Sequence, residues 1–121
     1  MGKLQVVLLL LVLSIHVYAE KPPEQKIAEL EKKLERVSGK EKLEVLNNLA
    51  SLLYTGDPAK CIEYCSEAID LAAELDYPGG KARALVNKSY ALSVQGERKK
   101  NLNKKLSNWK RNWKRYREKK K

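Results

Sequence analysis

Apolar residues recur at spacings of three and four positions along the central part of the chain. In the stretch from residue 24 to residue 37, the residues at this spacing are Ile27, Leu30, Leu34 and Val37. Such a spacing places side chains on one face of an α-helix. No segment alternates apolar and polar residues in the manner of a half-buried strand. The pattern therefore predicts an all-α fold.

Short turns divide this region into helices expected at residues 24–37, 40–54, 58–76 and 81–94. The clearest turn is TGDP, which ends at Pro58. In it Asp57 is placed to cap the third helix and Pro58 to begin it. The sequence QGE at residues 95–97 is expected to end the fourth helix. Turns this short predict antiparallel helix pairs.

Two of these helices resemble each other. Leu46, Ala50 and Leu53 match Leu85, Ser89 and Leu92 at a constant offset of 39 residues. Such an internal repeat predicts two copies of one helical hairpin. The second copy departs at Lys88, which occupies an apolar slot. There we expect the aliphatic stem to pack while the ammonium stays in water.

The repeat resembles the tetratricopeptide repeat, which reads W-x2-L-G-x2-Y, then A-x3-F, then a proline. The first copy gives Leu46-x2-Leu49-Ala50-x2-Leu53, then Cys61-x3-Cys65 and Ala68, without the final proline. The resemblance implies antiparallel hairpins stacked as a short α-solenoid. The core residues that it implies are Leu46, Leu49, Ala50, Leu53, Cys61, Cys65, Ala68, Leu85, Ser89 and Leu92.

Members of this family are scaffolds that bind proteins or peptides and are not enzymes, so the resemblance implies a non-catalytic interaction module. Its binding groove is lined by the exposed side of the first helix of each repeat. In this chain that side corresponds to Glu44, Asn47, Ser51, Arg83, Val86 and Tyr90. A repeat of this length behind a signal peptide resembles the extracytoplasmic arrays of bacterial sensor proteins. The chain is then expected to be a fragment of a longer sensor or scaffold.

The N-terminus has the pattern of a secretory signal peptide. Lys3 precedes an apolar run of twelve residues, LQVVLLLLVLSI, and Val17-Tyr18-Ala19 fits a cleavage site. The run is shorter than the roughly 20 residues of a membrane-spanning helix. We therefore expect cleavage near Ala19 and a secreted or periplasmic protein, with an uncleaved membrane anchor as the alternative.

The candidate chemistry of the chain is sparse. His16, the only histidine, lies in the expected signal peptide, so the mature chain has no imidazole to act as a general base. Cys61 and Cys65 are one helical turn apart, and no other Cys or mature His is available to complete a metal site with them. Both are expected to be small buried side chains. The sequence predicts no cofactor, no metal and no catalytic residue.

The net positive charge lies at the C-terminal end, because residues 1–97 hold twelve Lys and Arg against fourteen acids. The net charge is +10, and thirteen Lys and Arg against one acid lie in the basic tail, residues 98–121. A helix with aromatic and cationic residues suits anionic membranes or nucleic acids. The alternative function is therefore a small secreted cationic protein that binds such a partner through Trp109, Lys110, Arg111, Trp113, Lys114 and Arg115.

A second explanation of the tail comes from the genetic code. Asn-Trp-Lys occurs at residues 108–110 and again at residues 112–114. Read one nucleotide earlier, these codons must encode Leu-Glu each time, as in LEKKLE at residues 30–35. The tail is then the product of a frameshift in a longer repeat array. The expected organisation is a signal peptide at 1–19, a linker and amphipathic helix at 20–39, repeats at 40–97 and the tail at 98–121.

Overall fold

The computed structural model describes residues 2–17 and 21–121. Within these ranges all regular structure is α-helical, which confirms the predicted fold class. The helices are α1 (Gly2–Val17), α2 (Pro23–Leu34), α3 (Gly39–Leu53), α4 (Pro58–Glu74) and α5 (Pro78–Lys119). The cleavage site predicted near Ala19 lies outside the described residues.

The predicted start of α4 is confirmed in detail. The Asp57 carboxylate accepts a hydrogen bond of 3.1 Å from the backbone N–H of Lys60, and Pro58 is the first helical residue. This cap satisfies one of the backbone donors that a helix N-terminus leaves free. At the junction of α2 and α3, Gly39 has a φ of +58°, in the left-handed region that glycine adopts without strain.

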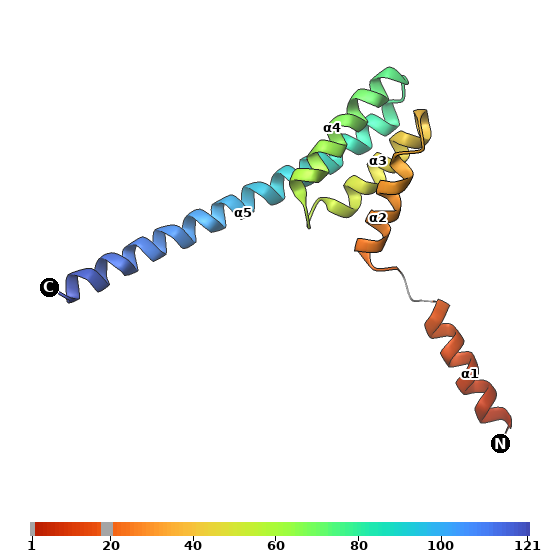
Figure 1. Ribbon diagram of the computed structural model, residues 1–121, viewed down its shortest axis with the longest axis horizontal. Coiled ribbons are helices and arrows are strands. Elements are labelled where there is room, and N and C mark those ends of the chain that lie inside the picture. The colour runs from red at the N-terminus through yellow and green to blue at the C-terminus, as the bar shows by residue number, and fades with distance from the viewer. Residues whose placement is uncertain (1, 18–20) are drawn as a thin grey trace.

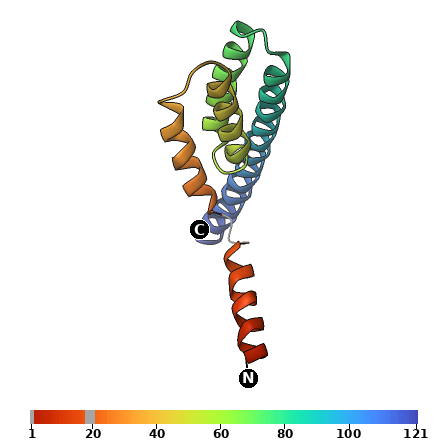
Figure 2. The same cartoon turned by 90° about the vertical axis from the view of Figure 1, so that its right-hand side faces the viewer.

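Helices α2 to α5 pack together into one body, which Figures 1 and 2 show from two sides. α3 is central and contacts α2, α4 and α5, while α4 also packs along α5. α3 and α4 form an antiparallel hairpin, and the first part of α5 returns beside both.

The interior of the body consists of leucines from α3 against small residues from α4 and α5. One buried cluster contains Leu43, Leu46, Ala68, Ala72 and Ala84. The other contains Ala50, Leu53, Cys61, Cys65 and Ala91. Because alanine and cysteine are small, the helix backbones approach closely: the Cys61 sulfur lies 3.2 Å from the Ala50 carbonyl oxygen.

The predicted end of the fourth helix is wrong. α5 continues without interruption through residues 95–97 to Lys119. A glycine inside a helix costs only about 1 kcal/mol relative to alanine, and good helix formers flank Gly96 on its C-terminal side. Beyond this point no other element packs on α5 to turn the chain back, since all residues from 96 to 121 are exposed.

The core residues expected from the second copy also differ in the structure. Leu85 and Leu92 are 46% and 51% exposed, and Ser89 is exposed as well. α5 instead packs on the body through its small face, which consists of Gly80, Ala84, Asn87 and Ala91. The face of α5 that carries Leu85 and Leu92 would be buried only if a following antiparallel helix packed on it. Because α5 continues as one helix to Lys119, no such helix forms in the described part of the chain. All the core residues expected from the first copy are buried: Leu46, Leu49, Ala50, Leu53, Cys61, Cys65 and Ala68.

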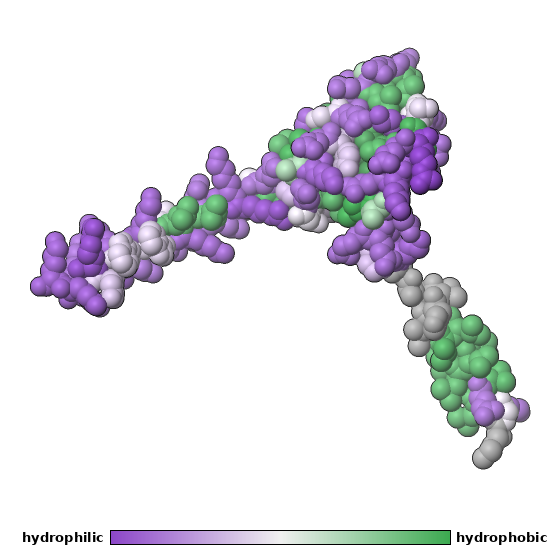
Figure 3. All heavy atoms as spheres, in the orientation of Figure 1, coloured by the Kyte–Doolittle hydropathy of each residue, from purple (hydrophilic) through white to green (hydrophobic). Residues whose placement is uncertain are grey.

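α1 stands apart from the body. It contacts no other helix among the described residues, and its exposed apolar side chains, from Leu4 to Leu13, lie all around it. Figure 3 contrasts this hydrophobic helix with the mainly hydrophilic end of α5. Within residues 2–17 and 21–121 no helix is both long enough and apolar enough to cross a membrane.

Candidate binding surface

A groove of about 450 Å³ runs between α2 and α3. Its apolar part is formed by Leu30 and Leu52, one from each helix. Its polar part consists of Lys26, Glu29, Lys33, Asn48 and Ser51. A concave apolar surface with a few polar groups around it is the usual form of a binding site in proteins.

The α2 wall of this groove is held in place by a polar contact on its other side. The Glu31 carboxylate accepts hydrogen bonds from Tyr64 Oη, at 3.0 Å, and from the Lys60 ammonium, both on α4. The Lys60 hydrogen bond is the main reason why the pKa of Glu31 lies below its usual value. Among the described helices the backbone of α2 lies close to that of α3 only, so this contact also links α2 to α4.

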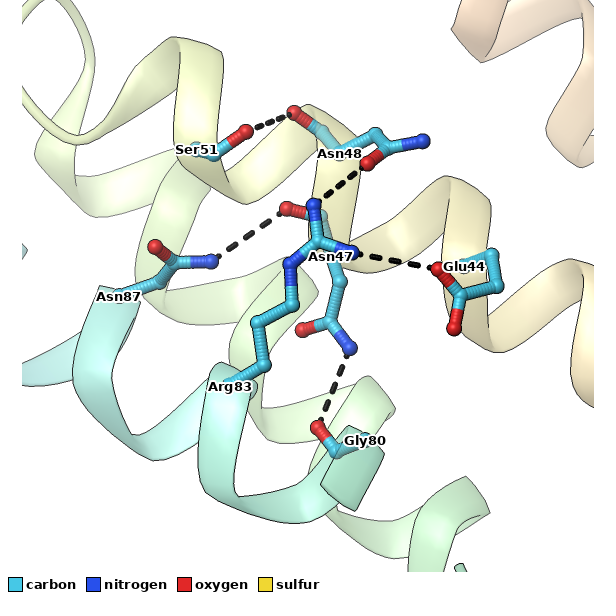
Figure 4. A network of polar contacts seen from close by, with 7 residues as sticks. All are labelled: Glu44, Asn47, Asn48, Ser51, Gly80, Arg83 and Asn87. Carbon is cyan, nitrogen blue, oxygen red and sulfur yellow. Dashed lines mark hydrogen bonds and ion pairs between the residues drawn. The ribbon is translucent and has the colours of Figure 1, made fainter.

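A polar network lies on the surface where α3 and α5 meet (Figure 4). The Arg83 guanidinium donates to Glu44 Oε2 at 3.2 Å and to Asn48 Oδ1 at 2.6 Å. Glu44 and Arg83 are both about half exposed, so water can reach the ion pair. Asn48 also lines the groove, so the network and the groove form one continuous surface.

Two asparagines lie beneath this network in the interior. Asn47 is 0% exposed, and its Nδ2 donates to the Gly80 carbonyl at 3.1 Å (Figure 4). Asn87 Nδ2 donates to the Asn47 carbonyl at 3.3 Å. Asn47 Oδ1 has no hydrogen-bond partner among the described residues. These amides join α3 to α5 at a place where a Cβ added to Gly80 would lie 2.5 Å from a Leu43 methyl carbon.

The residues predicted to line a groove are therefore divided between several places. Ser51 lines the groove, and Glu44 and Arg83 lie in the surface network beside it. Asn47 was expected on this surface, but the structure buries it as a packing residue. Val86 and Tyr90 are exposed on α5, where the Tyr90 ring lies 5.6 Å from that of Tyr54.

Sequence reasoning missed the contribution of α2 to the groove. It predicted an amphipathic helix over residues 24–37 but assigned no binding residue to that helix. Leu30 belongs to the periodic stripe, so the signal was present, but periodicity does not tell which stripe residues a neighbour leaves uncovered. The groove residues not anticipated were Lys26, Glu29, Leu30, Lys33, Asn48 and Leu52.

Cys61 and Cys65 are free thiols in the interior, both 0% exposed, with their sulfurs 3.9 Å apart. Burial raises the pKa of both thiols, and for Cys65 the neighbouring Cys61 raises it further, to about 12. A thiol reacts as its thiolate, so both side chains are in the least reactive state of cysteine.

We expect the two thiols to resist modification in the folded chain. At pH 8 a thiol-disulfide reagent should react with Cys65 about 10³-fold more slowly in the native protein than in the urea-unfolded one, because the folded thiol holds its proton. The raised pKa also contributes stability that is present below the unfolded thiol pKa and lost as pH rises toward 12. Rapid reaction in native buffer would contradict this, and the Cys61→Ala/Cys65→Ala variant gives the baseline.

In the part of the chain that the structure describes, no three His, Cys, Asp or Glu side chains are grouped so that they could hold a metal ion. Comparison of the chain with protein-family models, with curated proteins and with solved structures gives no match.

Proposed function

We propose that this chain is a non-catalytic helical-repeat module of tetratricopeptide type, which binds a peptide segment of another protein. The observation that carries the proposal is the groove between α2 and α3, with Leu30 and Leu52 as its apolar part and charged and amide side chains around them. Its volume of about 450 Å³ lies within the range of roughly 300–1,000 Å³ that is common for binding pockets.

The hairpin geometry supports the repeat type. α3 and α4 meet through small residues at the positions where the repeat pattern requires them, and the short distance from Cys61 to the Ala50 carbonyl reflects that approach. Repeat modules of this kind use extended surfaces for recognition. The Arg83 network borders the groove and offers a guanidinium and amides that suit a peptide backbone or carboxylate.

We place the module outside the cytoplasm and regard it as part of a longer exported sensor or scaffold. The support is the apolar α1, which precedes the body and contacts no other described helix. An export signal is expected to have this character.

Selection from a library of random linear peptides tests the function. The full chain is the bait, and the most enriched peptide is synthesised and its affinity measured by fluorescence anisotropy. Ser51→Arg should fill the groove and weaken binding at least about tenfold, which is about 1.4 kcal/mol. Ser51 makes only a 2.8 Å hydrogen bond to the Asn48 carbonyl, so the fold should tolerate the change.

Ser89→Arg is the matched control. Ser89 makes the same kind of bond within its own helix, to the Leu85 carbonyl, and lies outside the groove. Peptides that bind Ser51→Arg as well as they bind the unchanged chain would contradict the proposed site. Failure to enrich any peptide would contradict the proposed function.

A further inference from the structure

The tail carries an apolar stripe that no other described part of the chain covers. Its residues are Leu102, Leu106, Trp109, Trp113 and Tyr116, which are between 48% and 61% exposed. Their spacing alternates between four and three, so they lie on one face of α5. The three rings stack in a row, with centroids 6.3 Å apart for Trp109 and Trp113 and 5.6 Å apart for Trp113 and Tyr116. The stripe is thus a continuous apolar ridge.

The stripe faces the same side of α5 as the residues that pack on the body. Eighteen residues make five turns of an α-helix, so Leu102 lies above Ala84 and Trp109 above Ala91. Both alanines are fully buried against the body. The Arg98 guanidinium donates to the Thr55 carbonyl near the end of this contact. Past Arg98 the same side of α5 is open, where α5 extends beyond α3 and α4 (Figure 1).

Because the stripe and the body lie on the same side of α5, the body rises beside the stripe like a step. This shape favours a helical partner over a flat one. Packed helix axes lie 8–10 Å apart, so the body projects farther from the axis of α5 than the side chains of the stripe do. A flat bilayer surface would meet the body before it reached Leu102. A single helix, about 10 Å across, fits in the step and continues the packing that α3 and α4 make on α5.

Charge defines the chemistry of that partner. The tail holds thirteen Lys and Arg against one acid. By the same helical geometry Lys105 and Lys110 border the stripe on opposite sides, and neither forms an ion pair within the described residues. Two such tails would repel each other, which disfavours a second copy. Leu102 and Leu106 offer no ring on which a base could stack, which disfavours single-stranded nucleic acid.

We propose that the tail is a docking site for an acidic amphipathic helix of a partner protein. The partner helix has apolar residues at alternating spacings of three and four, which pack on the stripe from Leu102 to Tyr116. On both sides of these apolar residues the partner helix carries Asp or Glu, which form ion pairs with Lys105 and Lys110. This arrangement corresponds to the seam and flanking charges of a coiled coil.

The test uses a synthetic peptide about three heptads long, with Leu at positions a and d and Glu at positions e and g. Trp109 and Trp113 are the only tryptophans of the chain, so tryptophan emission reports on the stripe directly. Added to the full chain, the peptide should cause a saturable blue shift that weakens as salt rises. The same peptide with Lys in place of Glu should cause none.

Two matched pairs of variants locate the contact. Lys105→Gln/Lys110→Gln should weaken peptide binding at least about tenfold. Lys100→Gln/Lys104→Gln, which removes the same charge from the opposite face, should change it little. Leu102→Ala/Leu106→Ala should likewise weaken binding, in contrast to Leu85→Ala/Leu92→Ala, whose exposed leucines lie off the stripe.

The proposal is overturned if the glutamate peptide gives no saturable shift, or if each control pair weakens binding as much as its partner. It is also overturned if anionic phosphatidylglycerol vesicles or DNA shift the emission while the glutamate peptide does not. In that outcome the tail binds a lipid or nucleic-acid surface instead.

Discussion

Replacing Leu46 by alanine is expected to lower the free energy of unfolding by about 3 kcal/mol, within the range of 2–5 kcal/mol found for buried leucines. Replacing Leu85 by alanine is expected to lower it by less than about 0.5 kcal/mol. The two leucines occupy the same position of the internal repeat, 39 residues apart, and differ in what covers them.

The expected difference arises from packing. Leu46 is 0% exposed and belongs to the buried cluster that joins α3 to Ala68 and Ala72 of α4 and to Ala84 of α5. Its removal takes apolar surface out of the core and leaves a cavity that the surrounding helices close only in part. Leu85 is 46% exposed, so about half of its side chain is already in water, and alanine there leaves no enclosed cavity.

Urea unfolding followed by circular dichroism measures both values, with the unchanged chain as reference. A small domain has about 5–15 kcal/mol of stability in total, so Leu46→Ala should shift the midpoint clearly. An equally large loss for Leu85→Ala would mean that another helix covers that face in solution. The straight course of α5 would then be wrong, and the sequence-based expectation of a second hairpin would be right.

Helical periodicity predicted the fold class and the core of the first hairpin because α3 has one dominant apolar face. It failed on α5 because this helix has two candidate faces. One carries Leu85 and Leu92, which were expected in the core, and the other carries Ala84 and Ala91, which sequence reasoning did not consider. The structure packs the alanine face, since the small residues of α4 and the leucines of α3 leave room only for close approach. A pattern within one helix cannot reveal which face a neighbour will select.

The candidate site was predictable to a smaller extent for a related reason. Ser51 lines the groove between α2 and α3, whereas Asn47, next to the groove residue Asn48, was expected on the surface and is buried. Adjacent residues on a helix point about 100° apart, so a small error in the orientation of the helix exchanges surface for interior. In the folded chain α3 contacts α2, α4 and α5, so more than one of its faces is covered, and a polar residue such as Asn47 becomes buried. The sequence of α3 alone does not reveal these contacts.

The burial of Asn47 leads to the second large effect. Asn47→Asp is expected to lower the free energy of unfolding at pH 7 by at least about 3 kcal/mol, although the two side chains have nearly the same shape. The donor that reaches the Gly80 carbonyl at 3.1 Å is replaced by an oxygen. Leaving that buried acceptor without its donor costs about 1–3 kcal/mol, and an ionised carboxylate in a fully buried position costs more.

Water has little room to enter between the two helices here. A Cβ added to Gly80 would lie 2.5 Å from a methyl carbon of Leu43, so α5 is packed tightly against the Leu43 side chain of α3. The carboxyl group is therefore expected to hold its proton, which raises its pKa in the folded chain above the unfolded value of about 3.9. The protonated form can donate to Gly80 again.

The sign of the pH dependence follows from this. A group whose pKa is raised on folding contributes stability that is complete below the unfolded pKa and is lost as pH rises through the folded pKa. The deficit of Asn47→Asp relative to the unchanged chain should thus be small near pH 4 and should grow toward pH 7. Urea unfolding at a series of pH values measures it.

Asn48→Asp is the matched control for this variant, since it makes the same substitution on the next residue. Asn48 is only partly buried, and its Oδ1 accepts from the Arg83 guanidinium at 2.6 Å. A carboxylate there gains an ion pair at a wet surface, so stability should change by less than about 1 kcal/mol and should not fall as pH rises from 4 to 7. If Asn47→Asp behaved in the same way, Asn47 would have to face water, and the close contact of α3 with α5 at Gly80 would not exist in solution.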